Sequence, residues 1–262
     1  DTFIIKALNQ LIWLDSAVSV IYLQSDQRVT VLLEKMESVG LPLSQICEVK
    51  YGIKTGDNSK YISRVKSDVH TKKALKTGEI GRYRLVWRGL YLQWVRELAG
   101  YREDSVEKPK IIVQYIRKLS LPRRLVATLD DKGEYYPLNN YSYMILKNNA
   151  YSLEYILGVL NSSLMNFYFA NRYIDYNIKP TYLKKLPVAD SNKPGTDAEN
   201  VEKASKKIID LYQKIQAIPE NSNEWHSIKS EIEKTEHQID QLVYKLYNLT
   251  SEEIKLVEES DK

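Results

Sequence analysis

Hydrophobic side chains recur at alternating intervals of three and four residues through the C-terminal third of the chain. One series comprises Val201, Ala204, Ile208, Leu211, Ile215 and Ile218, and a second comprises Trp225, Ile228, Ile232, Thr235, Ile239, Leu242 and Leu246. This spacing is typical of helices that bury one seam, and residues 219–223 between the two series indicate a short turn. The pattern predicts an antiparallel helical hairpin that serves as a spacer or docking element. An independent coiled-coil dimer is the alternative.

The middle of the chain has a different pattern. Runs rich in β-branched and aromatic residues occupy residues 43–50, 110–117, 125–129, 135–137 and 142–146, and residues 130–133 indicate a turn. After Ser152, hydrophobic residues again recur every three or four positions up to Tyr168, which predicts a helix with one buried face. The expected fold class is therefore α/β, with a mixed α+β sheet domain followed by the helical hairpin.

These patterns divide the chain into three expected parts. Residues 1–39 form a helical lead-in, and because the chain begins with Asp1 rather than Met we expect it to be truncated. Residues 40–190 form the mixed α/β domain. Residues 191–262 form the hairpin, which residues 191–195 join to the domain as a polar linker.

Charge follows the same division. The chain has 262 residues and a formal net charge of +4, but residues 40–190 carry 25 basic and 14 acidic side chains, whereas residues 191–262 carry 10 and 15. A basic domain between acidic flanks is expected where one domain faces a polyanion. A solvated basic surface without a ligand is the alternative.

The candidate DNA contacts lie in three clusters of the basic domain. Lys54, Thr55 and Asn58 lie on a loop that includes Gly52 and Gly56, where glycines permit close backbone approach. Arginine matches guanine or phosphate geometrically, and glutamine matches adenine. The remaining candidates are Arg82, Arg84 and Arg88, which alternate with aromatic residues, and Gln114, Arg117, Lys118, Arg123 and Arg124. A plain turn or solvated charges would account for the same residues without DNA.

No pattern indicates a catalytic or metal site. The spacing from Gly52 to Gly56 is too short for a P-loop, and His70, His226 and His237 lack metal-ligand spacing. A single cysteine, Cys47, excludes a disulfide framework and fits a cytoplasmic protein. The most hydrophobic window, residues 3–23, is interrupted by polar residues, so it lacks the roughly 20 apolar residues of a membrane helix. We expect no membrane partner.

Several strings occur in a familiar order. They are GIKTGDN at 52–58, KPKIIV at 108–113, ATLD at 127–130, PLNN at 137–140, YILGVLNSSLMNFY at 155–168, YLKKLP at 182–187 and IDQLVYKLYNLTSEEI at 239–254. Together they resemble the Taq-type C-terminal target recognition (specificity) domain of type IIG restriction-modification enzymes and adenine-specific DNA methyltransferases. The resemblance covers residues 29–258.

The resemblance implies a sequence-specific reader of double-stranded DNA that is itself non-catalytic. In such enzymes an upstream domain of the same chain carries the S-adenosylmethionine loop and the Asn-Pro-Pro-Tyr motif for adenine N6 methylation. A nuclease that uses Mg²⁺ can precede it. This chain has neither the S-adenosylmethionine loop nor the Asn-Pro-Pro-Tyr motif, so we expect it to contain no cofactor. Two alternatives remain: a type I-like specificity subunit in which the hairpin is a spacer, and a scaffold module that binds an acidic protein.

Overall fold

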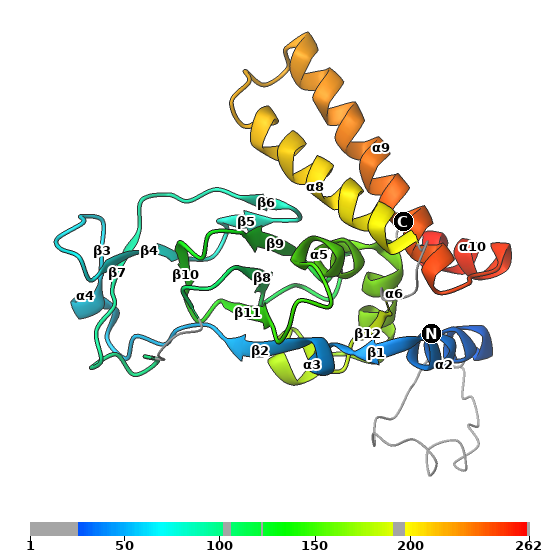
Figure 1. Cartoon of the computed structure of the whole chain (residues 1–262), viewed down its shortest axis with the longest axis horizontal. Coiled ribbons are helices and arrows are strands. Elements are labelled where there is room, and N and C mark those ends of the chain that lie inside the picture. Colours follow the sequence, from blue (N-terminus) through cyan, green and yellow to red (C-terminus); the bar gives the residue numbers. More distant parts are fainter. Residues whose placement is uncertain (1–25, 102–105, 122, 191–196, 261–262) are drawn as a thin grey trace, which may run out of the picture.

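The computed structural model describes residues 26–101, 106–121, 123–190 and 197–260 (Figure 1). Its helices are α2 (Gln27–Val39), α3 (Leu43–Ile46), α4 (Asn58–Tyr61), α5 (Leu153–Asn161), α6 (Ser163–Arg172), α7 (Pro180–Leu183), α8 (Asp197–Ile215), α9 (Asn223–Leu246) and α10 (Ser251–Ser260). Its strands are β1 (Gly40–Pro42), β2 (Cys47–Tyr51), β3 (Ile62–Ser63), β4 (Thr71–Leu75), β5 (Ile80–Gly81), β6 (Arg84–Leu85), β7 (Tyr91–Gln93), β8 (Lys110–Gln114), β9 (Ala127–Asp130), β10 (Tyr135–Pro137), β11 (Tyr141–Leu146) and β12 (Pro187–Ala189).

Two four-stranded sheets form the centre of the molecule. The first has the order β2-β11-β8-β9 and is antiparallel throughout. The second has the order β10-β4-β7-β3, in which β10 and β4 are parallel and the other pairs antiparallel. The predicted mixed α/β fold is therefore confirmed. One run differs: residues 43–46 form the short helix α3 rather than a strand, because one helical turn directs both Leu43 and Ile46 into the core.

Strand β8 is buried on both faces and joins the layers of the domain. Ile111 and Val113 belong to the hydrophobic core that includes α5 and α6, whereas Ile112 belongs to the core shared with the second sheet. Successive side chains of a strand point to opposite faces, so alternate residues of β8 fill different cores. The result is three layers: helices α5 and α6, the first sheet, and the second sheet.

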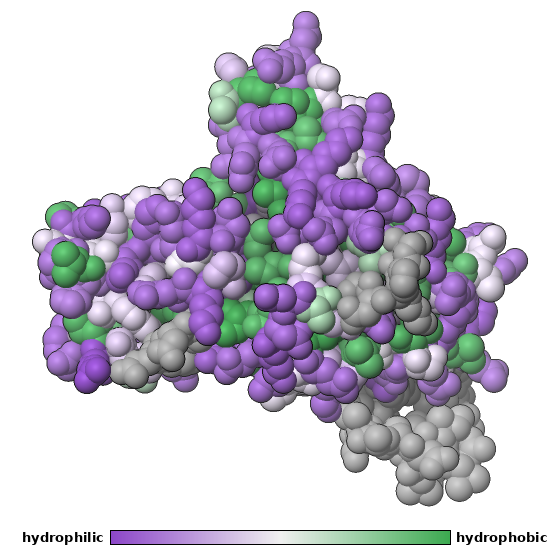
Figure 2. Space-filling model, viewed as in Figure 1, coloured by the Kyte–Doolittle hydropathy of each residue, from purple (hydrophilic) through white to green (hydrophobic). Residues whose placement is uncertain are grey.

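The predicted helical hairpin is present as α8 and α9, which rise from the body of the molecule (Figure 1). Near the domain its seam is buried, at Val201, Ala204, Ile208, Ile232, Thr235, Ile239 and Leu242. Towards the tip, Ile215, Ile218 and Trp225 are half-buried, and Figure 2 shows hydrophobic surface there. The seam is therefore fully buried only at the base of the hairpin. The division into the parts 1–39, 40–190 and 191–262 stays a prediction. The hydrophobic window at 3–23 and the expected linker at 191–195 lie outside the described residues.

Close contact between α5 and α8 depends on Gly158. A β-carbon at this position would lie 2.4 Å from Ser205 Oγ and 2.7 Å from Val201 Cγ1, closer than such atoms approach. We expect Gly158→Val to lower the free energy of unfolding by about 1–3 kcal/mol, because the added side chain overpacks the helix interface. Urea denaturation checks this. Ala170→Val, on an exposed position of α6, is the control and should change stability little; equal losses in both variants would contradict the packing argument.

Cys47 is buried at the start of β2. Its thiol is 1% exposed, and burial raises its pKa to about 12. Because the thiolate is the reactive form, we expect a disulfide reagent at pH 8 to label the native chain about a thousandfold more slowly than the urea-unfolded chain. Labelling at equal rates in the two states would show that the thiol is accessible.

No helix among the described residues is long and apolar enough to cross a membrane.

Candidate nucleic-acid interface

Three segments meet where strands of the two sheets end. Ile53 pairs with Leu138 in a parallel bridge, Ile53 N donates to Pro137 O at 2.8 Å, and Leu138 N donates to Leu75 O at 3.1 Å. The hydroxyl of buried Tyr141 donates to the carbonyl of Lys76. These bonds hold together Lys54, Thr55, Asn58, Lys76, Asn139 and Asn140, which we call the loop face.

Glycine is required where these segments touch. A β-carbon on Gly52 would lie 2.1 Å from Leu138 O, and one on Gly100 would lie 2.7 Å from Lys54 N. Gly56 has φ +79°, in the region that glycine adopts without strain. The glycines therefore permit close backbone approach, as the sequence predicts, but the backbone that they approach belongs to another segment of this chain.

The loop face surrounds a hollow of about 270 Å³. Its aliphatic lining residues, which we call the floor, are Ile53, Ile62, Leu90 and Leu138, and its polar lining residues, which we call the rim, are Thr55, Asn58, Lys76, Asn139 and Asn140. Thr55 Oγ1 donates to Asn58 Oδ1 at 2.5 Å, which leaves the Asn58 amide nitrogen as the donor for a ligand. Asp57 caps α4, and hydrogen bonds led by that from the Ser59 hydroxyl hold the pKa of its carboxyl below the usual value.

A row of aromatic rings extends the loop face. Lys54 Nζ lies 5.7 Å from the centre of the Tyr51 ring, and the Tyr51 ring meets that of Tyr115 edge to face at 4.8 Å. Burial, followed by the neighbouring Tyr115, raises the pKa of Tyr51. Gln114 precedes Tyr115 and lies opposite Tyr141 across β8 and β11. The backbone of Gln114 thus lies near the ring pair that extends from Lys54.

Arg88 lies close to the same edge. The buried carboxylate of Glu79 accepts Lys76 N at 2.7 Å and Arg88 N at 2.9 Å, so one side chain fixes both backbone segments. The side chain of Arg88 is exposed. It adds a cation next to Lys76.

Two arginines expected to contact DNA instead bind the hairpin. Arg82 forms an ion pair with Glu236, and Arg123 lies 3.5 Å from Asp240. Both also donate to Asn161 O, at 3.4 and 3.1 Å. Because their charges are matched by carboxylates on α9, we remove Arg82 and Arg123 from the expected DNA contacts and assign them to hairpin docking.

Arg124 and Arg117 are also engaged within the chain. Arg124 is 2% exposed, donates to Asp175 O, and stacks over the Phe169 ring at 5.5 Å. Arg117 donates to Arg123 O at 2.8 Å. Burial is the first cause of the lowered pKa of both guanidinium groups. Arg124 is therefore a structural residue, since a buried guanidinium cannot reach DNA, and Arg117 is half-buried beside it.

The last two candidates lie apart from the loop face. Arg84 is exposed at a hollow of about 490 Å³ beneath the hairpin, where it meets Tyr212, Trp225 and Glu236. Lys118 is exposed on the segment after β8. The structure thus gathers Lys54, Thr55, Asn58, Arg88 and Gln114 along one edge, and it does not bring all eleven predicted residues onto one concave face.

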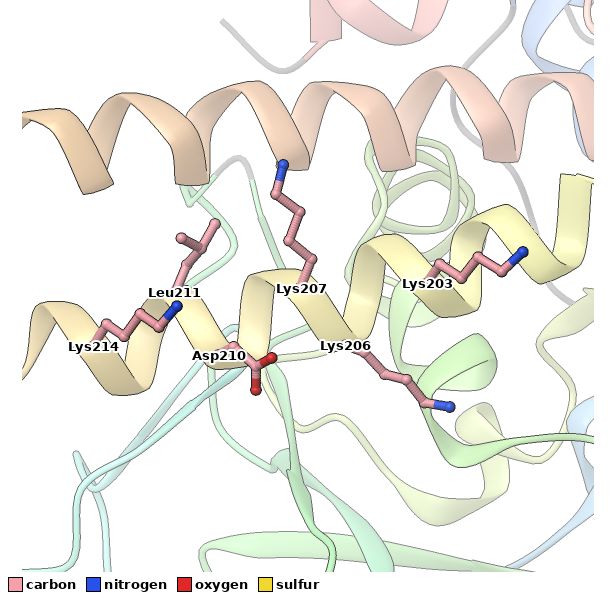
Figure 3. Close-up of a pocket in the computed structure, with 6 residues that line it drawn as sticks. All are labelled: Lys203, Lys206, Lys207, Asp210, Leu211 and Lys214. Carbon is pink, nitrogen blue, oxygen red and sulfur yellow. The ribbon is translucent and has the colours of Figure 1, made fainter.

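A second group of cations lies on α8. Figure 3 shows Lys203, Lys206, Lys207 and Lys214 along this helix, with Lys207 directed towards α9. Lys206 pairs with Glu202 at 2.6 Å, and Lys207 pairs with Glu231 of α9. These carboxylates neutralise much of the charge, so the row stabilises the hairpin and is a poorer phosphate surface than the loop face.

Sequence reasoning missed Lys76, Asn139, Asn140, Tyr51 and Tyr115. The pair Asn139-Asn140 falls between the β-prone runs at 135–137 and 142–146 and belongs to the PLNN string of the resemblance, but neither signal marks the two side chains as ligand contacts. Among the described residues there is no cluster of three or more His, Cys, Asp or Glu side chains that could hold a metal ion.

Comparison with known proteins agrees with this architecture. Residues 72–188 match the TaqI-like C-terminal specificity domain, a segment that runs from β4 to β12. The fold resembles that of the type IIL restriction-modification enzyme MmeI, solved in complex with DNA, with 12% sequence identity and a TM-score of 0.54 over 84% of this chain and 36% of that one. A type I restriction-modification S subunit from M. genitalium matches with 13% identity and a TM-score of 0.35 over 86% of this chain and 54% of that one. No curated protein matches.

The chain therefore shares its fold with a part of a restriction-modification enzyme. The match of residues 72–188 to the TaqI-like C-terminal specificity domain confirms the resemblance seen in the sequence. The chain spans the equivalent of 36% of MmeI.

Proposed function

We propose that this chain reads a specific sequence in double-stranded DNA for a restriction-modification enzyme that methylates adenine at N6. The observation that carries the proposal is the loop face, which presents lysine and amide side chains at one edge of a TaqI-like specificity domain. Specific recognition needs cations for phosphates and hydrogen-bonding groups for base edges, and this edge has both.

The loop face, together with Arg88 and Gln114 close to it, offers the two kinds of contact. Lys54, Lys76 and Arg88 supply charge for phosphates, whereas Asn58, Gln114, Asn139 and Asn140 supply amides for base edges. The backbone bonds between the segments keep these groups in place before DNA arrives. Binding then costs little ordering of the loops, which favours affinity.

Methylation and any cleavage would be the work of other parts of the parent enzyme. We propose that an upstream methyltransferase domain binds S-adenosylmethionine, and that Mg²⁺ serves a nuclease if the parent has one. This role places the protein in the cytoplasm. A type I-like specificity subunit is a second candidate, favoured by the hairpin tip, where half-buried Ile215, Ile218 and Trp225 suit packing against another helix.

Selection from a randomised duplex pool by the purified 262-residue chain tests the proposal. We expect a consensus sequence of a few base pairs and affinity that falls as salt rises, because phosphate contacts release counterions. Recovery of random sequences, with binding indifferent to salt, would remove DNA recognition as the function. A consensus recovered by the chain alone would also oppose the scaffold alternative.

A further inference from the structure

The chemistry of the hollow at the loop face specifies which base pair it fits. Three asparagine side chains stand at its rim, with one threonine and one lysine, over a floor of four aliphatic residues. Its lining residues include no arginine and no carboxylate. On the major-groove edge, asparagine pairs with adenine N6 and N7, aliphatic groups contact the thymine methyl, arginine and lysine can pair with guanine, and carboxylates accept from cytosine.

From this set of groups we propose that the hollow reads one A·T base pair by its major-groove edge, with Asn139 and Asn140 as the residues that determine specificity. The inference rests on the proposed function, since it names the base pair that one part of the DNA-reading face takes. In the described part of the chain the side chains of Asn139 and Asn140 form no hydrogen bond, so their donors and acceptors are open to a base.

The backbone around the two asparagines is fixed although their side chains are not. Tyr115 N donates to Asn140 O at 2.9 Å, and Tyr141 N donates to Leu138 O at 3.0 Å, which closes the turn. The floor residue Leu138 is held between Ile53 and Leu75 by backbone pairing. A thymine methyl can therefore meet a preformed aliphatic floor while the neighbouring adenine meets the amides.

Asn58 and Lys76 complete the rim in different roles. Asn58 has its oxygen occupied by Thr55, so it offers only donors, which suit thymine O4 or a phosphate. Lys76 is the single cation among the lining residues, and a flexible ammonium acts as a point charge towards phosphate. A lysine can also contact guanine O6 or N7, so this assignment places the Lys76 ammonium on a phosphate and leaves the base edge to the asparagines and the floor.

Repeating the duplex selection with the double variant Asn139→Ala, Asn140→Ala tests this assignment. We expect one A·T position of the consensus to accept any base pair while the other positions keep their preference. Affinity for the original consensus should fall roughly 5- to 150-fold, with affinity for unrelated duplex unchanged. The retained affinity for unrelated duplex also shows that the variant is folded.

Analogue DNA tests the same position with the unaltered protein. At the position that relaxes, 7-deazaadenine removes the N7 acceptor and uracil removes the thymine methyl, so each should weaken binding of the wild-type chain several-fold. Binding of the double variant should be indifferent to the 7-deaza substitution. Asn149→Ala is the matched control, because Asn149 is an exposed asparagine beyond the opposite end of β11.

The outcomes separate this inference from the proposed function. If the wild-type chain selects no consensus, the proposed function itself fails. If a consensus is found but the double variant relaxes no position, relaxes a G·C position, or weakens all duplexes alike, DNA recognition stands and the A·T assignment is wrong.

Discussion

Lys110→Met should lower the free energy of unfolding by about 3–5 kcal/mol, because it leaves a buried carboxylate without its cation. Lys110 and Asp130 are fully buried on neighbouring strands, with Nζ 2.6 Å from Oδ2. The ammonium also donates to Val106 O at 2.6 Å, and Asp130 accepts Glu134 N and Tyr135 N. Burial lowers the pKa of Lys110, which Asp130 partly opposes.

Chemical denaturation measures this loss, with Lys108→Met as the control. Lys108 lies two residues before Lys110 and is exposed, so its replacement should change stability by less than about 0.5 kcal/mol. A loss below about 1 kcal/mol for Lys110→Met would contradict the picture of an ion pair sealed from water. Because the pair fixes the turn from β9 into β10, the loss should also loosen the segment that leads to Asn139.

Asn161→Leu should cost about 1–3 kcal/mol, since it leaves the buried Ala127 N–H without a partner, whereas Ala127 O keeps the hydrogen bond from Tyr83 N at 2.9 Å. The Asn161 side chain accepts from Ala127 N and donates to Ala127 O, both at 3.0 Å, and so completes the hydrogen bonding of β9 at the edge of its sheet. The Asn161 carbonyl accepts from Arg82 and Arg123. One residue thus joins the sheet edge to the arginines that bind the hairpin.

Thermal and urea denaturation of Asn161→Leu check this role. Asn171→Ala is the control, because Asn171 makes one side-chain hydrogen bond, to Phe167 O of its own helix α6, and should lose about 1 kcal/mol or less. Equal losses of unfolding free energy in the two variants would contradict this role, because the hydrogen bonds from Asn161 to β9 would then stabilise the fold no more than the single bond of Asn171.

The helical parts of the fold were predictable because their signals are local. The spacing of Ile208, Ile232 and Ile239 identifies the buried seam without knowledge of where the hairpin packs, and Thr250 with Glu253 forms a capping box. Strand β8 was equally clear, since a continuous apolar run indicates burial on both faces. The split into two sheets was not predictable, because strand order depends on pairings between distant residues.

The site was predicted only in part, because part of it also depends on contacts between residues that are distant in the sequence. The glycines around Lys54 mark a constrained loop locally, but the partners of Arg82 and Arg123 lie on α9, and the Arg123–Asp240 pair spans 117 positions. Charge patterning identifies a cation and cannot show that a distant carboxylate neutralises it. Asn139 and Asn140 belong to the PLNN string that carries part of the resemblance, but uncharged amides in a turn have no local pattern that marks them as ligand contacts. The structure supplies both corrections.

The most direct test of the account is the salt dependence of binding to two duplexes of equal length, one with the selected consensus and one with the same bases scrambled. If the chain contacts about six phosphates, the logarithm of each binding constant should fall against the logarithm of salt concentration with a slope near −5. The consensus duplex should bind tighter by on the order of a thousandfold at every salt concentration. Equal affinity for the two duplexes, or binding without salt dependence, would contradict the claim that this chain reads DNA sequence.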